Sequence, residues 1–87
     1  MGKGKIFQRT LTRDSKDWEC KNALYISMTN TGGGDVILRS NGGNSLLRPN
    51  ETIQFFGDVQ ALIDDYFVLI SVPLNVEVQI RATIYEE

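Results

Sequence analysis

Residues that could carry catalysis are sparse in this chain of 87 residues, which has no histidine and a single cysteine, Cys20. A nucleophilic thiol or hydroxyl needs a neighbouring base, and histidine supplies it most often. We therefore expect Cys20 to be a small buried apolar residue, and a hydrolase of the triad type is excluded. The lack of histidine also removes the usual ligand of zinc, and one cysteine cannot form a disulfide within the chain.

Paired carboxylates are the remaining candidates for acid–base chemistry. The nearest pairs are Asp64 with Asp65, Asp14 with Asp17, and Glu86 with Glu87. Neighbouring residues on a strand point to opposite faces, so Asp64 and Asp65 converge only where a loop redirects one of them. The loops also lack the alternating Asp/Asn spacing of a dedicated calcium site, although calcium binding by the acidic loops stays open. We expect no enzyme, no cofactor and no metal site.

Two glycine-rich segments, 31–35 and 41–44, invite comparison with loops that bind phosphate. A phosphate loop needs Gly-Lys-Ser/Thr at the start of a helix, whereas Asp35 follows the first segment and a strand comes next. Both segments are therefore interpreted as hairpin turns, and Asn41-Gly42 favours a type I′ turn. Residues 47–52 resemble the Leu-x-Pro-Gly-Glu turn phrase of many β-sandwich domains, with Asn50 where glycine is usual.

Aromatic side chains give the better argument for binding. Tyr25 and Tyr85 both occupy polar positions of alternating segments, so both are expected to face outward. If their strands are neighbours, the two rings form a platform for a sugar ring, a base or another protein, with Trp18 nearby. The alternative is that exposed tyrosines are ordinary strand residues that pack across strands.

The elements that must position these residues are strands. Segment 76–85 alternates without a break, which is typical of a strand with one face on a core. Its inward residues are Val76, Val78, Ile80, Ala82 and Ile84, and its outward residues are Glu77, Gln79, Arg81, Thr83 and Tyr85. Six more strands are predicted over 5–12, 23–30, 36–40, 45–48, 51–56 and 66–72, with 5–12 at an edge.

Three details of this arrangement are specific enough to test. The strand over 36–40 is expected to return antiparallel to 23–30 through the turn at 31–35. The nearly continuous apolar segment 66–72 predicts a central strand that is covered on both faces, followed by a turn at 73–75. Segment 57–64 is the one place where a helix competes, with at most one short helical turn near 58–64.

The fold class expected from these signals is all-β: a small antiparallel β-sandwich, jelly-roll-like, or a small barrel, with about six to eight strands. A length of 87 residues allows one domain, spanning 1–87, with a basic N-terminal arm or edge strand over 1–13. Strand order and the choice between sandwich and barrel stay open. The sequence shows neither a secretion signal nor a membrane-spanning stretch, so we expect a cytoplasmic protein.

Charge is distributed unevenly. Residues 1–21 contain six basic and three acidic side chains, whereas 22–87 contain three basic and eight acidic ones. The basic residues of the arm are Lys3, Lys5, Arg9 and Arg13. Such an arm can bind the acidic body of a neighbouring copy, or it can be an ordinary solvated edge strand. The acidic body repels polyanions, so we expect no contact with nucleic acid except through the arm.

Together these observations favour a non-enzymatic structural or interaction module, acting as a subunit of a homo-oligomer or a larger assembly. By analogy of architecture alone, such a module could serve as an accessory structural protein of a virion or phage. The outward residues of 76–85 are the first candidate contact surface, with Tyr25 and Trp18 beside them, and the basic arm is the second. The alternative is a module that binds carbohydrate or another small ligand through Trp18, Tyr25 or Tyr85.

Overall fold

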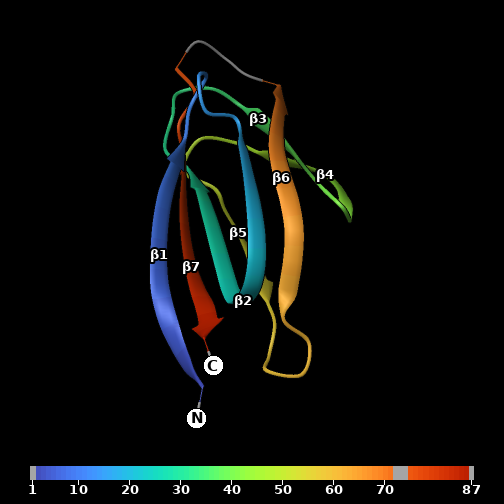
Figure 1. Ribbon diagram of the computed structural model, residues 1–87. Coiled ribbons are helices and arrows are strands. Elements are labelled where there is room, and N and C mark those ends of the chain that lie inside the picture. The colour runs from blue at the N-terminus through green and yellow to red at the C-terminus, as the bar shows by residue number, and fades with distance from the viewer. Residues whose placement is uncertain (1, 72–74, 87) are drawn as a thin grey trace.

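The computed structural model describes residues 2–71 and 75–86 and has an all-β antiparallel fold, as predicted (Figure 1). Seven strands form within the described residues, and no helix does. The strands are β1 Lys3–Leu11, β2 Asp17–Asn30, β3 Val36–Ser40, β4 Gly43–Leu47, β5 Thr52–Phe56, β6 Ile63–Ser71 and β7 Val78–Glu86. The turn predicted at 73–75 falls largely on residues outside the described ones.

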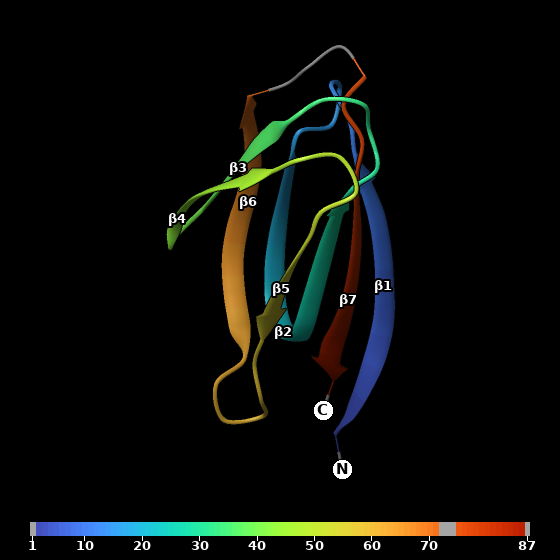
Figure 2. The same ribbon diagram turned by 180° about the vertical axis from the view of Figure 1, so that it is seen from behind.

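Strand β2 organises the sheet because it pairs with three other strands. Its C-terminal part lies between β7 and β5, while its N-terminal part pairs with β6. The pairing register shifts on both sides of Ala23, and Asn22 has a positive φ of 60°. Bulges of this kind bend a strand. The sheet therefore folds into two layers, β1-β7-β2-β5 and β2-β6-β3-β4, that face each other (Figure 2).

The core lies between these layers and contains a stack of aromatic rings. The ring of Trp18 on β2 is stacked between Phe7 of β1 and Phe67 of β6, with centroid distances of 5.4 and 5.8 Å. Phe55 of β5 also packs on Phe67, at 5.4 Å. Stacking of this kind adds to the free energy gained by burying the rings. Cys20 is buried beside this stack, as predicted.

Strand β7 follows its predicted alternation. The inward residues Val78, Ile80 and Ala82 are buried, and their neighbours Gln79 and Arg81 are exposed. β7 is hydrogen-bonded on both sides, to β1 and to β2. β1 pairs with β7 alone, so the prediction of an N-terminal edge strand is confirmed.

The predicted hairpin at 31–35 is wrong, because β3 pairs with β4 and β6 and not with β2. The buried side chain of Asn30 redirects the chain. Its Nδ2 donates to the carbonyl oxygens of Gly34 and Leu47 at 2.8 and 3.0 Å, and its Oδ1 accepts from the Gly32 N–H at 3.0 Å. Residues 31–35 therefore cross from one layer to the other.

The expectation for 57–64 also needs correction, because the chain makes a tight turn there instead of a helical one. Asp58 bridges to Ala61, and its Oδ1 accepts from the N–H groups of Gln60 and Ala61 at 2.8 and 2.9 Å. An Asp side chain that satisfies these donors competes with helix formation.

Strand β6 is central, as predicted, because it pairs with both β2 and β3. However, it is covered on one face only. Phe67 and Leu69 are buried, whereas Tyr66 and Ile70 are 44% and 41% exposed. The continuous apolar run therefore does not indicate a strand buried on both faces.

The hairpin between β3 and β4 is confirmed, but its turn is not of type I′. A type I′ turn needs a positive φ at both Asn41 and Gly42. Among the described residues, the positive φ in this hairpin occurs at Gly43 instead, at 125°. No helix in the described part of the chain is long and apolar enough to cross a membrane.

Candidate functional site

The outward face of the layer β1-β7-β2-β5 gathers most of the predicted contact residues. Strand pairing aligns them in rows that run across all four strands, because directly paired residues share a face. One row consists of Ile6, Thr83, Tyr25 and Phe56, and we call it the apolar row because a large apolar side chain lies at each of its ends. The ring of Tyr25 packs against Phe56 with a centroid distance of 5.3 Å. Ile6 and Phe56, at the two ends of this row, are 77% and 74% exposed.

The next two rows on this face are polar. They consist of Gln8, Arg81, Ser27 and Gln54, and of Thr10, Gln79, Thr29 and Thr52. Some of these side chains bond across strands: Gln54 Nε2 donates to the Tyr25 hydroxyl at 2.9 Å, and the hydroxyl oxygens of Thr29 and Thr52 lie 2.8 Å apart. The Arg81 guanidinium has no carboxylate within ion-pair distance among the described residues.

Two adjoining hollows indent this face. The larger, of about 240 Å³, is lined by Ile6, Gln8, Tyr25, Arg81, Ala82 and Thr83. The smaller, of about 150 Å³, lies one step along the strands and is lined by Gln8, Arg9, Thr10, Gln79, Ile80 and Arg81. Gln8 and Arg81 border both hollows, so the polar row separates an apolar hollow from a polar one.

Some of the predicted surface residues lie elsewhere or are already bonded. Trp18 is only 6% exposed, so the prediction that it lies beside the tyrosines on the surface is wrong. Glu77 lies at the end of the face, where its Oε1 accepts from the Thr31 hydroxyl at 2.6 Å.

Tyr25 and Tyr85 both face outward on neighbouring strands, but their rings do not form one platform. A Cβ placed on Gly2 would overlap the Tyr85 ring, so that ring leans over the start of β1. The Tyr25 ring packs on Phe56, toward the opposite edge of the layer. The exposed aromatic pair on this face is therefore Tyr25 with Phe56.

Sequence reasoning missed Ile6 and Phe56, although a signal for both exists. Each belongs to a pair of adjacent apolar residues within a strand, with Phe7 and with Phe55. Since adjacent strand residues point to opposite faces, one member of each pair must point away from the core. Phe7 and Phe55 pack inward, which leaves Ile6 and Phe56 outside.

The basic residues near the N-terminus lie mostly on β1, which is a paired strand and not a free arm. Lys5 Nζ lies 3.8 Å from a carboxylate oxygen of Glu86, and Arg9 donates to the Ser15 hydroxyl at 2.8 Å. Lys3 also belongs to β1, and Arg13 is exposed in the loop that follows. β1 therefore presents basic charge along an edge that pairs with no other described strand.

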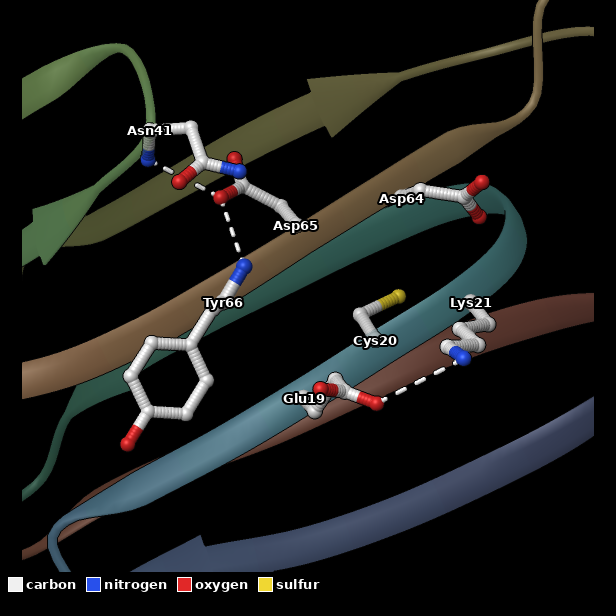
Figure 3. Close-up of a pocket in the computed structure, with 7 residues that line it drawn as sticks. All are labelled: Glu19, Cys20, Lys21, Asn41, Asp64, Asp65 and Tyr66. Atoms are coloured by element: carbon white, nitrogen blue, oxygen red, sulfur yellow. Dashed lines mark hydrogen bonds and ion pairs between the residues drawn. The ribbon is translucent and has the colours of Figure 1, made fainter.

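Three acidic residues, Glu19, Asp64 and Asp65, line a hollow of about 210 Å³ in the other layer (Figure 3). Asp64 and Asp65 point apart there, and each satisfies backbone N–H groups. Asp64 Oδ1 accepts from Asn22 at 2.8 Å and so supports the bend of β2. Asp65 Oδ1 accepts from Asn41 at 2.9 Å and so holds the β3–β4 turn. These contacts give both carboxylates a structural role.

The thiol of Cys20 borders the same hollow but is poorly suited to nucleophilic chemistry. Burial, with the nearby charges of Asp64 and Asp65, raises its pKa to about 11. A nucleophilic cysteine needs the opposite shift, because the thiolate is the reactive form. Within the described residues, no group of three or more Asp, Glu or Cys side chains is arranged to hold a metal ion.

Comparison with protein-family models and with curated proteins gives no match to this chain.

Proposed function

We propose that this protein is a non-enzymatic structural subunit that binds other protein subunits, most simply copies of itself, through the outward face of β1, β7, β2 and β5. The observation that supports this proposal is the apolar row that ends in Ile6 and Phe56, two large side chains that are 77% and 74% exposed. Covering such side chains is favourable by roughly 1.5–3 kcal/mol each. Single exposed apolar residues are ordinary, but an aligned row across four strands suits a contact surface.

The polar row beside it has the composition expected at the border of a protein interface. Arginine is enriched in interfaces, and amide and hydroxyl groups supply directional hydrogen bonds around an apolar centre. Arg81 occupies the middle of this row on a central strand. A partner carboxylate can approach it without displacing a carboxylate of the described residues.

Light scattering in dilute solution tests the proposal. The expected mass is a multiple of the 9.8 kDa chain, and a monomer at all concentrations would contradict self-assembly. Phe56→Ser should lower the mass. Leu46→Ser is the matched control, because Leu46 is 53% exposed and its strand β4 belongs to the other layer. If Leu46→Ser dissociates the assembly and Phe56→Ser does not, the contact lies on the other layer.

The charge on the face has its own test. Arg81→Glu should weaken association, because it places a negative charge in the middle of the contact. Arg39→Glu, on β3 of the other layer, makes the same change at an exposed position and should leave the mass unchanged. By analogy of architecture, a virion is one assembly that such a subunit would suit.

A second candidate function, binding of a carbohydrate or another small ligand, draws support from the 240 Å³ hollow beside Tyr25. Tryptophan emission is an unsuitable probe, since Trp18 is buried. Ligand binding would instead shift the backbone NMR signals of Tyr25 and Thr83 on addition of glycans. Unchanged signals across a broad glycan panel would contradict this alternative.

A further inference from the structure

The two lateral edges of the layer β1-β7-β2-β5 are complementary to each other. Among the described strands, β1 pairs with β7 alone and β5 pairs with β2 alone, so each has one edge without a paired strand. The free edge of β1 lies at the outer side of the molecule in Figures 1 and 2. All three pairings in this layer are antiparallel. β1 and β5 therefore run in opposite directions, and β5 of one copy can accept β1 of another as an antiparallel neighbour.

We propose that copies of this chain associate head to tail, with β1 of one copy added to the free edge of β5 in the next. This inference rests on the proposed function and specifies its interface. Because the two edges belong to different parts of the chain, the contact is heterologous and generates a ring or a filament rather than a two-fold dimer.

The residue pattern selects one register. Even-numbered residues of both strands face outward. Because directly paired residues share a face of the sheet, an even-numbered residue of β5 must pair with an even-numbered residue of β1. Placing Phe56 opposite Ile6 of the next copy continues the apolar row. The same register places Gln54 opposite Gln8 and Thr52 opposite Thr10, so each polar row is also continued. A shift by two residues would instead place Phe56 against Gly4 or Gln8.

Charge supports the same pairing. β1 carries Lys3, Lys5 and Arg9 and has no acidic residue, whereas residues 51–58 contain Glu51 and Asp58 and have no basic residue. In the proposed register, Asp58 in the turn after β5 lies opposite Gly4 of the next copy, between Lys3 and Lys5 along β1, so opposite charges meet at this end of the contact. A two-fold pairing of β1 with itself about Phe7 would instead oppose Lys5 and Arg9, and facing like charges are destabilising.

Disulfide trapping tests the contact directly. In the double variant Gln8→Cys/Gln54→Cys, the two cysteines are three strand spacings apart within one chain, about 14 Å. They cannot bridge intramolecularly, because disulfides need Cα atoms within about 7 Å. Mild oxidation should therefore give a ladder of covalent multimers on a non-reducing gel.

The pair Thr10→Cys/Thr52→Cys should behave in the same way. Gln79→Cys/Gln54→Cys, which moves one cysteine to central β7, should give no ladder.

The outcomes separate this inference from the proposed function. An oligomer by light scattering that gives no ladder above the Gln79 control overturns the edge pairing alone. A monomer by light scattering overturns both. Dimers formed as readily by Gln8→Cys on its own would show that β1 pairs with itself about Gln8, and would overturn the head-to-tail arrangement.

A charge variant gives an independent measurement. Lys3→Glu should lower the average mass, because it replaces a positive charge near Asp58 of the next copy with a negative one. Lys16→Glu makes the same change in the exposed loop before β2 and should leave the mass unchanged. Equal masses for both variants and the unmodified protein would contradict the proposed register.

Discussion

The side-chain nitrogen of Asn30 donates a hydrogen bond to the carbonyl oxygen of Leu47 at 3.0 Å and so ties the end of β2 to the end of β4. Asn30 is fully buried, and each of its side-chain polar atoms has a partner. Its backbone also exchanges hydrogen bonds with Asn50 and Glu51. One residue therefore holds together the crossover at 31–35, the end of β4 and the start of β5.

Asn30→Ala is expected to lower the free energy of unfolding by about 2–5 kcal/mol, because it removes three hydrogen bonds of a fully buried side chain, one of them to the buried carbonyl oxygen of Leu47. Denaturant unfolding followed by circular dichroism measures this loss. Asn44→Ala is the matched control, because the Asn44 side chain is exposed and its one hydrogen bond among the described residues is accepted from Arg39. Its effect should stay within about 0.5 kcal/mol. Similar values for the two variants would show that the buried amide does not hold the crossover.

Asn50 gives a second prediction, because its φ is 69°, in the left-handed region. Asparagine tolerates this conformation, glycine adopts it freely, and a β-branched residue is strained there. Asn50→Gly should therefore change the unfolding free energy by less than about 0.5 kcal/mol, whereas Asn50→Val should lower it by about 1–2 kcal/mol. Equal stability of the two variants in denaturant unfolding would contradict this account of the turn.

The strands were predictable wherever local alternation matches the final burial. The sequence pattern of 76–85 places the inward and outward residues of β7 correctly, and the turn phrase at 47–52 indicates the left-handed residue at Asn50. Both signals are local, because side-chain direction and turn conformation depend on a few neighbouring residues.

The connections were not predictable, because distant contacts decide them. Nothing near Asn22 in the sequence indicates a bulge, since its stabilising partner Asp64 lies 42 residues away. Likewise, the glycines at 31–35 suit a hairpin locally, and the buried amide of Asn30 overrides that preference. Ile6 and Phe56 join one row only once the strand order is known.

The buried position of Trp18 leads to a third prediction. Trp18→Ala should destabilise the protein by about 3–5 kcal/mol, because it removes the middle ring of the stack with Phe7 and Phe67. Trp18→Phe keeps an aromatic ring there and should cost less. Since Trp18 is the only tryptophan, its native emission should be blue-shifted and poorly quenched by acrylamide. Emission like that of the unfolded chain would contradict its burial.

The fourth prediction concerns Cys20, whose pKa is raised from 9.0 to about 11 by burial and by the charges of Asp64 and Asp65. The folded state therefore holds the thiol proton more tightly than the unfolded state does. Below pH 9 both states keep this proton, and the raised pKa leaves stability unchanged with pH. Between pH 9 and about 11 only the unfolded state loses it, so the free energy of unfolding falls as pH rises, by about 2–3 kcal/mol in total.

Denaturant unfolding at a series of pH values measures this dependence. The fall should be smaller in Cys20→Ala by the amount that the thiol contributes. The hydrogen bond that the Tyr66 hydroxyl donates to Asp17 raises the pKa of Tyr66, so this side chain also contributes to the pH dependence of stability at alkaline pH. Tyr66→Phe therefore serves as the control, and it should keep the part of the fall that Cys20→Ala removes. If Cys20→Ala falls as steeply as the unmodified protein, the thiol is not shielded in the folded state.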